Sequence, residues 1–310
     1  MKIVAGLGSV EEYESYVKAG ADELFAGYVP ARWSEKYGTL LPINRREVRF
    51  ANVQLGSKED LLILRKKIEA YGVPVILTFN SPFYAECQYD EIVDVIRECV
   101  EIGYRDFIVA DPALLLRLRS EGVSRSIHLS GEIGEINTSL LREAEPANIK
   151  RVIFHRKNSI SDMQSIIENC SGFIPEYEAF FLNEKCHFTG GFCNSLHCDE
   201  MCHICHIPNR LGVMENAGKL PEEIPVSQPE EYLVGETGCG LCALWKLREA
   251  GITHLKIVGR GNYPEDMARD IAAAKAARSL LDANIHEESY IAEVRRTFFP
   301  DGCSENCYYI

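Results

Sequence analysis

The feature that most constrains the fold of this sequence is an alternation of short apolar runs with amphipathic stretches. The runs are rich in β-branched residues, which predicts strands at Lys2–Ala5, Glu23–Ala26, Pro74–Phe79, Asp106–Ala110, Ser126–Leu129, Arg151–Phe154, Tyr177–Leu182 and Leu255–Val258. Stretches such as KEDLLILRKKIEAYG and YDEIVDVIRECVEIG repeat apolar residues at i, i+3 and i+4, which predicts helices between the strands. Eight strands alternating with helices predict an α/β protein of the (β/α)8, TIM-barrel-like class.

The alternation is interrupted between the seventh and eighth predicted strands, where residues 183–253 hold seven cysteines and no clear strand. An insertion at this point follows the carboxyl end of a strand, so it opens at the barrel mouth. We therefore expect residues 1–182 to form the first seven β/α units and residues 183–253 a Cys-rich metal-binding insertion. Residues 254–296 would supply the last strand and closing helix, and residues 297–310 a cysteine-containing tail.

The overall charge limits the classes of partner. A net charge of −13 makes a nucleic-acid surface unexpected, because such surfaces need clustered Lys and Arg, and favours a small-molecule or peptide substrate. The N-terminal segment MKIVAGLGSVEEYESY lacks the apolar core of a secretory signal. No apolar run is long enough to span a bilayer, and we expect a cytoplasmic protein.

Seven cysteines within 57 residues of a protein from a reducing compartment indicate metal ligation before disulfides. They are Cys186, Cys193, Cys198, Cys202, Cys205, Cys239 and Cys242. Zinc and a four-iron cluster both accept four thiolates, so spacing alone does not separate them. The segment CDEMCHIC has the C-x3-C-x2-C spacing of radical S-adenosylmethionine enzymes, but it follows the seventh predicted strand instead of the first. Cys303 and Cys307, in the tail, are candidates for extra ligands or a redox pair.

Polar residues end most of the predicted strands, at the rim that carries the active site in such barrels. They are Asn80, Asp111, His128, Ser130, His155, Arg156, Asn183 and Arg260. Asp111 precedes Pro112 and is equally suited to cap a helix. His128 alternates within its strand, which by itself favours a structural histidine.

Five of the side chains near the rim have chemistry suited to catalysis. Arg156 and Arg260 are candidates to clamp carboxylates, with a salt bridge as the alternative role for each. His128 and His155 are candidates for general acid or base. Glu132 would either pair with Lys157 or carry a proton.

Several segments, in order along nearly the whole chain, resemble the collagenase-like peptidase family U32. They are AGADELFAGY, VILTFN, GYRDFIVADPALLLRLRS, IHLSGEIGEIN, CHFTGGFC, CHIPNR and AGITHLKIVGRG. His128, Ser130 and Asn137 match one family motif, in which Glu132 replaces Gln. The chain departs from the family at Lys157 and Val258, which both stand where the family has Glu.

The resemblance implies a barrel-like fold with an oxygen-sensitive four-iron four-sulfur (4Fe-4S) cluster at its mouth. In the better-understood branches it also implies oxygen-independent hydroxylation of RNA bases or quinone precursors, with prephenate as oxygen source. It implies Cys186, Cys193 and Cys205 as cluster ligands, with a fourth from Cys239 or Cys242. The missing rim carboxylates and the acidic surface favour a different acceptor here.

These arguments lead to one main hypothesis and two alternatives. The first is a 4Fe-4S enzyme that hydroxylates a small molecule or peptide, with prephenate as candidate co-substrate. We predict a catalytic group of His128, Glu132, His155 and Arg156, and a substrate-binding group of Asn80, Asp111, Ser130, Asn137 and Arg260. The alternatives are a zinc- or cluster-stabilised scaffold working with a second U32-type subunit, and a protease.

Overall fold

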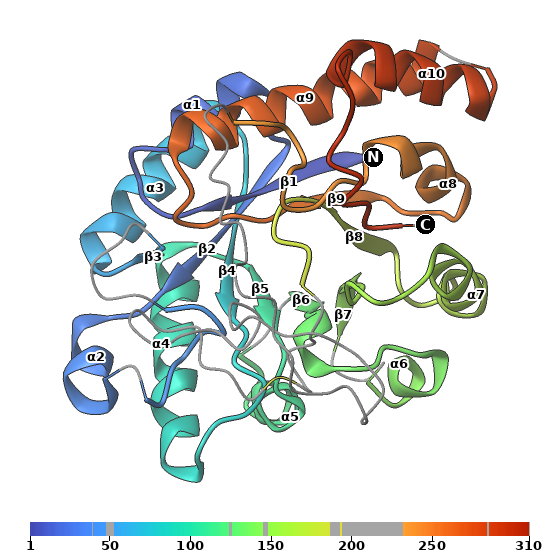
Figure 1. Ribbon diagram of the computed structural model, residues 1–310. Coiled ribbons are helices and arrows are strands. Elements are labelled where there is room, and N and C mark those ends of the chain that lie inside the picture. The colour runs from blue at the N-terminus through green and yellow to red at the C-terminus, as the bar shows by residue number, and fades with distance from the viewer. Residues whose placement is uncertain are drawn as a thin grey trace, which may run out of the picture.

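The computed structural model describes residues 1–38, 40–47, 53–123, 126–144, 148–186, 193, 232–283 and 285–309 (Figure 1). Its strands are β1 (Lys2–Leu7), β2 (Glu23–Tyr28), β3 (Gln54–Leu55), β4 (Val75–Phe79), β5 (Asp106–Val109), β6 (Ser126–Leu129), β7 (Ile149–Ile153), β8 (Glu176–Leu182) and β9 (His254–Ile257). All the pairings between them are parallel, in the order β1-β9-β8-β7-β6-β5-β4-β2, and β1 also pairs with β2. The predicted eight-stranded barrel is therefore confirmed, and the short β3, which was not predicted, adds to β2 outside the ring.

Helices surround the barrel (Figure 1). They are α1 (Tyr13–Ala19), α2 (Ala31–Tyr37), α3 (Lys58–Tyr71), α4 (Tyr89–Ile102), α5 (Pro112–Ser120), α6 (Thr138–Ala144), α7 (Ile160–Cys170), α8 (Leu244–Glu249), α9 (Pro264–Ala283) and α10 (Glu287–Phe298), with 3-10 turns η1 (Glu86–Gln88), η2 (Gly131–Ile133) and η7 (Leu241–Ala243). Ser57 and Ser159 cap α3 and α7 through reciprocal bonds with Asp60 and Asp162, which satisfy otherwise unpaired N–H groups. None of the described helices combines the length and apolar character needed to cross a membrane.

Side chains alternate along each strand between the barrel interior and the helices. The outward residues form the main core, and a smaller apolar cluster includes Phe25, Ile76, Ile108, Ile153 and Phe180. This cluster fills the barrel interior, because its members alternate with the outward residues of their strands. The interior is therefore a packed core and not a pore.

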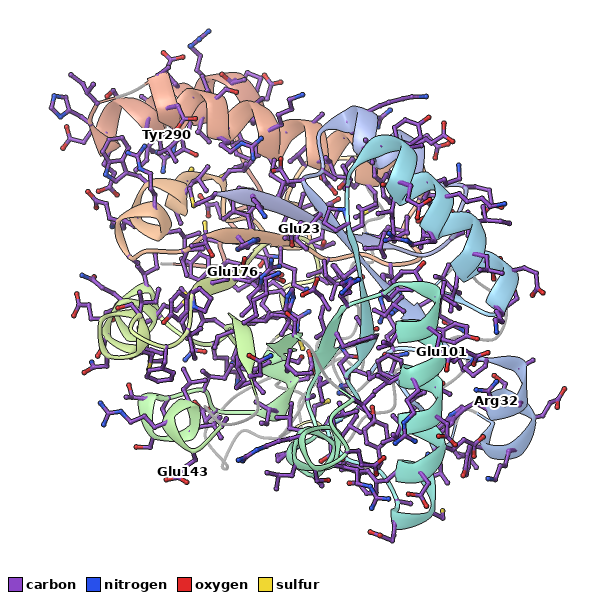
Figure 2. The ribbon with its side chains drawn as sticks, turned by 180° about the vertical axis from the view of Figure 1, so that it is seen from behind. Glu23, Arg32, Glu101, Glu143, Glu176 and Tyr290 are labelled. Carbon is purple, nitrogen blue, oxygen red and sulfur yellow. The ribbon has the colours of Figure 1, made fainter. Side chains whose placement is uncertain are left out.

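An ionic network fills the amino-terminal end of the barrel. Arg151, 1% exposed, reaches Glu178 Oε2 at 2.8 Å through Nη1, and Glu23 Oε2 at 2.7 Å and Glu176 Oε2 at 2.8 Å through Nη2. Lys256 Nζ lies 2.7 Å from Glu178 Oε1. Figure 2 labels Glu23 and Glu176 from behind the view of Figure 1. Because these charges are buried, removing one side chain would leave its partners as uncompensated charges inside the barrel.

Two helices follow β9 where a single closing helix was expected. The long α9 packs against α1 and β1, and α10 packs against α9, α8 and η7. Tyr290 of α10, labelled in Figure 2, is fully buried and donates a hydrogen bond to Leu241 O at 2.7 Å. The C-terminal tail after α10 is thereby brought back to the carboxyl end of β8.

Candidate active site at the carboxyl end of the barrel

Predicted site residues from six strands lie at one end of the barrel. Asn80 follows β4, Asp111 follows β5, Ser130 follows β6, His155 and Arg156 follow β7, Asn183 follows β8 and Arg260 follows β9. Since all these strands are parallel, their carboxyl ends share one rim.

Arg260 is a buried cation at this rim, 6% exposed. Its Nη1 lies 3.5 Å from Thr78 Oγ1 and its Nη2 lies 3.5 Å from the carbonyl of Arg46. A Cβ at Gly27 would stand 2.4 Å from Nη1, so glycine leaves the path of the guanidinium open. Burial lowers the pKa of Arg260 to about 10. Among the described residues no carboxylate forms an ion pair with it, which suits it to an anionic ligand.

Arg156 is held by two contacts at the same rim. Its Nη1 lies 3.3 Å from Glu132 Oε1, and its guanidinium carbon lies 4.0 Å above the Phe180 ring. Glu132 also reaches Arg45 Nε at 3.5 Å, so one carboxylate bridges two arginines. The expected alternative partner, Lys157, is exposed and forms no such pair with Glu132 in the described structure.

The surroundings of Arg156 show which groups face it. Burial opposes its charge, but Tyr308, Glu132, Cys186 and Glu184 together raise the pKa of Arg156. Its Nε is buried without a hydrogen-bond partner among the described residues. Arg156 therefore keeps its charge and one donor available at the rim.

His155 is oriented by the turn that follows β7. Its backbone N–H donates to Asn158 Oδ1 at 3.0 Å, and its ring Nδ1 accepts from the Lys157 N–H at 3.0 Å. Burial lowers the pKa of His155, with Glu132 opposing the shift. The neutral ring consequently carries its proton on Nε2.

His128 lies inside the barrel, below the rim, and is 1% exposed. Its Nε2 is 3.8 Å from Asp106 Oδ1, and neither ring nitrogen has a hydrogen-bond partner in the described structure. Burial lowers the pKa of His128 to about 3. This placement agrees with the structural role that its position within a strand favours.

Four predicted substrate-binding residues accept hydrogen bonds from other groups of the protein. Asn80 Oδ1 accepts from the Arg45 N–H at 3.0 Å, which ties the loop before β3 to the rim. Asp111 accepts from Ala113 N at the start of α5 and from Tyr89 Oη, while Ser130 accepts from Glu132 N. The fourth, Asn137, is exposed and accepts from Leu140 N. These side chains therefore shape the loops of the rim.

The predicted cysteine ligands separate into two groups. Cys186 follows β8 at the mouth beside Arg156, and the carbonyl of Cys193 accepts from Arg45 Nη2 at 3.4 Å. Cys239 and Cys242 line a small pocket together with Cys303 and Cys307. Cys198, Cys202 and Cys205 lie outside the described residues.

Two polar residues of the mouth were not predicted. Asn44 is fully buried and accepts from Thr78 Oγ1 at 2.8 Å, and its own N–H donates to Glu47 Oε1 at 2.6 Å. Burial raises the pKa of Glu47 to about 7, although Arg260 opposes the shift. The N-x-x-E spacing of Asn44 and Glu47 was the available signal.

A comparison with known protein families shows which family the chain belongs to. The profile of peptidase family U32 matches residues 8–309. The chain belongs to peptidase family U32. A curated relative, tRNA hydroxylation protein P of Escherichia coli (strain K12), is 23% identical over 192 residues, which cover 62% of this chain and 38% of the relative. The U32 chain thus spans less than half the length of this relative.

Solved structures match the chain at low sequence identity. A U32 peptidase structure matches with a TM-score of 0.43 and 14% identity, covering 58% of this U32 chain and 69% of that one. Rubisco from Pyrococcus horikoshii matches with a TM-score of 0.49 and 12% identity, covering 96% of this chain and 64% of that one. Dihydrodipicolinate synthase from Agrobacterium tumefaciens matches with a TM-score of 0.47 and 9% identity, covering 95% of this chain and 78% of that one.

Replacing Glu47 by glutamine should change how stability depends on pH. The pKa of Glu47 is raised from 4.5 to about 7, so the proton favours the folded state below pH 4.5 and this stability is lost as the pH rises through 7. The shift corresponds to about 3 kcal/mol. Urea unfolding at pH 5 and pH 8 should show a smaller decline for Glu47→Gln than for the wild type. Glu69→Gln, at an exposed position of α3, is the control, and equal declines in all three proteins would contradict the assignment.

Proposed function

We propose that this U32 protein is an iron–sulfur enzyme that hydroxylates a small molecule or peptide without dioxygen, with prephenate as oxygen donor. The observation that carries the proposal is Arg260, a buried guanidinium without a carboxylate partner among the described residues. Prephenate is a dicarboxylate, and a guanidinium fork binds carboxylates through two parallel hydrogen bonds. The name of the curated relative supports hydroxylation as the reaction class.

The residues at the mouth have donor chemistry that suits a 4Fe-4S cluster. Cys186 and Cys193 bring two thiols to the region of Arg156 and Arg45, whose positive charges would offset cysteine thiolates. Cys205, with Cys239 or Cys242, completes the predicted ligand set. When bound, the cluster supplies an electron-transfer or Lewis-acid centre.

The protein side chains would perform the binding steps. Arg260 and Arg156 would each hold a carboxylate of the donor, and Glu132 fixes the direction of the Arg156 guanidinium. The ring of Phe180 lies below Arg156 and excludes water from one side of the site. A dry, preorganised site strengthens these charge interactions.

Two groups are suited to proton transfer. His155 would donate the proton on Nε2, since its Nδ1 is occupied by the Lys157 N–H. Glu47, with a pKa of about 7, would exchange a proton close to neutral pH. The two residues offer an acid and a base from two loops of the mouth, one after β7 and one before β3.

The acceptor is proposed from charge. The name of the curated relative refers to tRNA, but the net charge of −13 of this chain favours an acceptor without a phosphate backbone. A peptide or small molecule therefore comes first, and tRNA serves as a comparison substrate.

Anaerobic purification with an optical spectrum and counts of iron, sulfide and zinc tests the proposal. We expect about four irons and four sulfides per chain, lost in Cys186→Ala and Cys205→Ala and retained in Cys87→Ala, at an exposed cysteine. Wild-type protein with oxygen-labelled prephenate should then pass the label to an acceptor. Zinc without iron or sulfide would refute the redox proposal and favour the scaffold. Cleavage of a denatured protein, abolished by thiol alkylation, would instead support a protease.

A further inference from the structure

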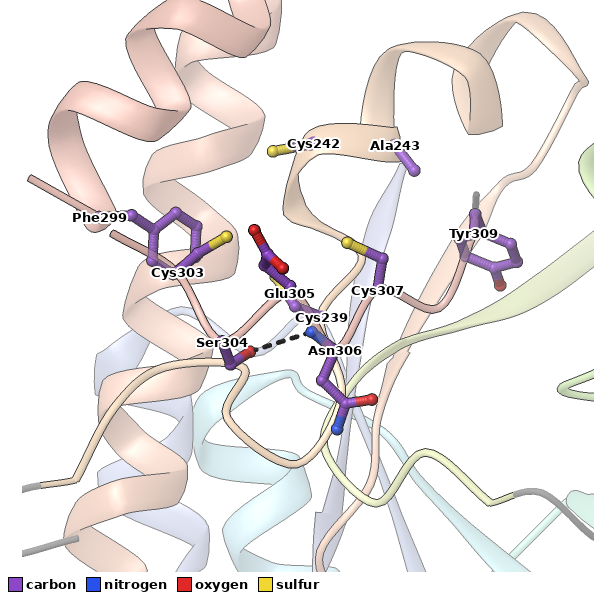
Figure 3. A pocket seen from close by; sticks show the side chains of 10 residues that line it. All are labelled: Cys239, Cys242, Ala243, Phe299, Cys303, Ser304, Glu305, Asn306, Cys307 and Tyr309. Carbon is purple, nitrogen blue, oxygen red and sulfur yellow. Dashed lines mark hydrogen bonds between the residues drawn. The ribbon is translucent and has the colours of Figure 1, made fainter. Parts of the chain in front are cut away.

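Four cysteines from two distant parts of the chain line one small pocket beside the barrel. Cys239 and Cys242 precede α8 in a C-x2-C pair, and Cys303 and Cys307 form a C-x3-C pair after α10. The pocket has a volume of about 30 Å³. Figure 3 shows the sulfurs of Cys303 and Cys307 turned toward one another across it, with the Cys242 sulfur at its edge.

The backbone holds the two pairs together. Cys239 N–H donates to Asn306 O at 2.9 Å, and Tyr308 N–H donates to Cys239 O at 2.8 Å, so the tail pairs with the segment around Cys239. Ser304 Oγ and Asn306 Nδ2 donate to the carbonyls of Gly235 and Glu236. Main-chain hydrogen bonds therefore hold the two segments, and with them the four thiols, next to one another.

Donor groups lie near two of the sulfurs. The backbone of Leu241 lies near Cys239, and the side chain of Arg295 lies near Cys242. A Cβ at Gly235, whose φ is +73°, would stand 2.9 Å from the Cys239 sulfur, so the chain turns closely around it. Donors of this kind orient thiolates and offset their charge when a metal binds.

We propose that these four cysteines form a tetrahedral zinc site that fastens the C-terminal tail to the barrel. Two closely spaced cysteine pairs from separate segments are the usual arrangement of a structural zinc site with four thiolate ligands. Within the described residues no three such ligands yet stand at metal-binding distance, so the thiols must rotate inward as zinc displaces their protons.

The zinc site would act on the barrel mouth through Tyr308, the residue after Cys307. Tyr308 is 7% exposed, stacks on Phe180 at a centroid distance of 6.5 Å and donates a hydrogen bond to Asn183 O. Tyr308 is also one of the groups that raise the pKa of Arg156. Fastening the tail therefore places a phenol at the rim, independently of the proposed reaction.

The proposal takes Cys239 and Cys242 away from the predicted cluster, whose fourth ligand would then be Cys198 or Cys202. Metal analysis separates the two sites. Full-length protein, purified anaerobically, should contain about one zinc per chain. Cys303→Ser and Cys307→Ser should each reduce bound zinc at least about tenfold and leave iron and sulfide unchanged. Cys186→Ser should instead reduce iron and sulfide and leave bound zinc unchanged. Cys87→Ser should change neither the zinc content nor the iron and sulfide content.

Cobalt substitution of the wild type provides a readout that does not depend on how well the variants fold. It should give the thiolate-to-cobalt absorption and intense visible bands of a tetrahedral site, and zinc should displace them. Circular dichroism checks the fold of each variant. Loss of iron and sulfide in Cys303→Ser, unchanged zinc in both tail variants, or wild-type protein without zinc would each overturn the proposal. The first of these results would leave the iron–sulfur function intact.

Discussion

Arg151→Ala is expected to destabilise the folded protein by about 3–5 kcal/mol, because it leaves carboxylates buried without their cation. Arg151 is 1% exposed and contacts Glu23, Glu176 and Glu178, which come from β2 and β8. A loss of this size is a large share of the roughly 5–15 kcal/mol that stabilises a typical domain. Urea unfolding at neutral pH, monitored by circular dichroism, measures it.

Two further variants distinguish a broken network from a general effect of mutation. Arg97→Ala removes an exposed arginine that pairs with Asp94 and Glu121, and should cost less than about 1 kcal/mol. The double variant Arg151→Met with Glu23→Gln should lose less stability than the sum of its single variants. Equal losses for Arg151→Ala and Arg97→Ala would contradict the buried network.

The same network predicts sensitivity to acid. Burial disfavours the charge of Glu178, but Lys256 and Arg151 lower its pKa to about 2. A lowered pKa contributes stability above pH 4.5 that is lost as the pH falls toward 2. Glu178 therefore adds to unfolding at low pH, in contrast to Glu47, whose contribution is lost as the pH rises.

Arg260→Met is expected to weaken the binding of prephenate by about 10- to 100-fold, since a hydrogen bond to a charged group contributes roughly 1.5–3 kcal/mol. The stability of the folded protein should not decrease. Arg260 is a buried cation with no carboxylate partner among the described residues, so replacing it removes a desolvated charge. Calorimetric titration measures the affinity, and urea unfolding should show stability equal to or above that of the wild type.

An independent variant tests the same geometry from β2, the strand that holds Gly27. Gly27→Ala would place a methyl group 2.4 Å from Arg260 Nη1 and should displace the guanidinium, which lowers prephenate affinity while the arginine remains. Arg97→Met, at the surface, should bind as the wild type does. Unchanged affinity in Arg260→Met would remove this arginine from the donor site.

The order of the barrel was predictable because strands and helices follow local periodicity. Ser126–Leu129 matched β6, and the other predicted strands differed at their ends by a few residues. β3 has two residues, which is too short for a periodic sequence pattern. Only its pairing with β2 in the folded structure identifies it as a strand. The rim residues were also predictable, since parallel strands end at one edge.

The contacts made within the rim were less predictable. Glu132 pairs with Arg156 and Arg45 instead of Lys157, because the side chain of Lys157 points to solvent after the turn at His155. Burial gives Glu47 its raised pKa, and no local pattern reports the burial of a glutamate in a loop.

By itself the sequence determined a barrel of eight β/α units, family membership, and a concentration of cysteines between its last two strands. The tertiary structure alone decided which cysteines meet, because Cys242 and Cys303 are about 60 residues apart and only the return of the tail over α10 joins them. It also decided that Arg151 forms ion pairs, whereas Arg260 has no carboxylate partner among the described residues. Local sequence encodes the direction of a side chain, whereas its partners come from strands that the closed barrel brings together.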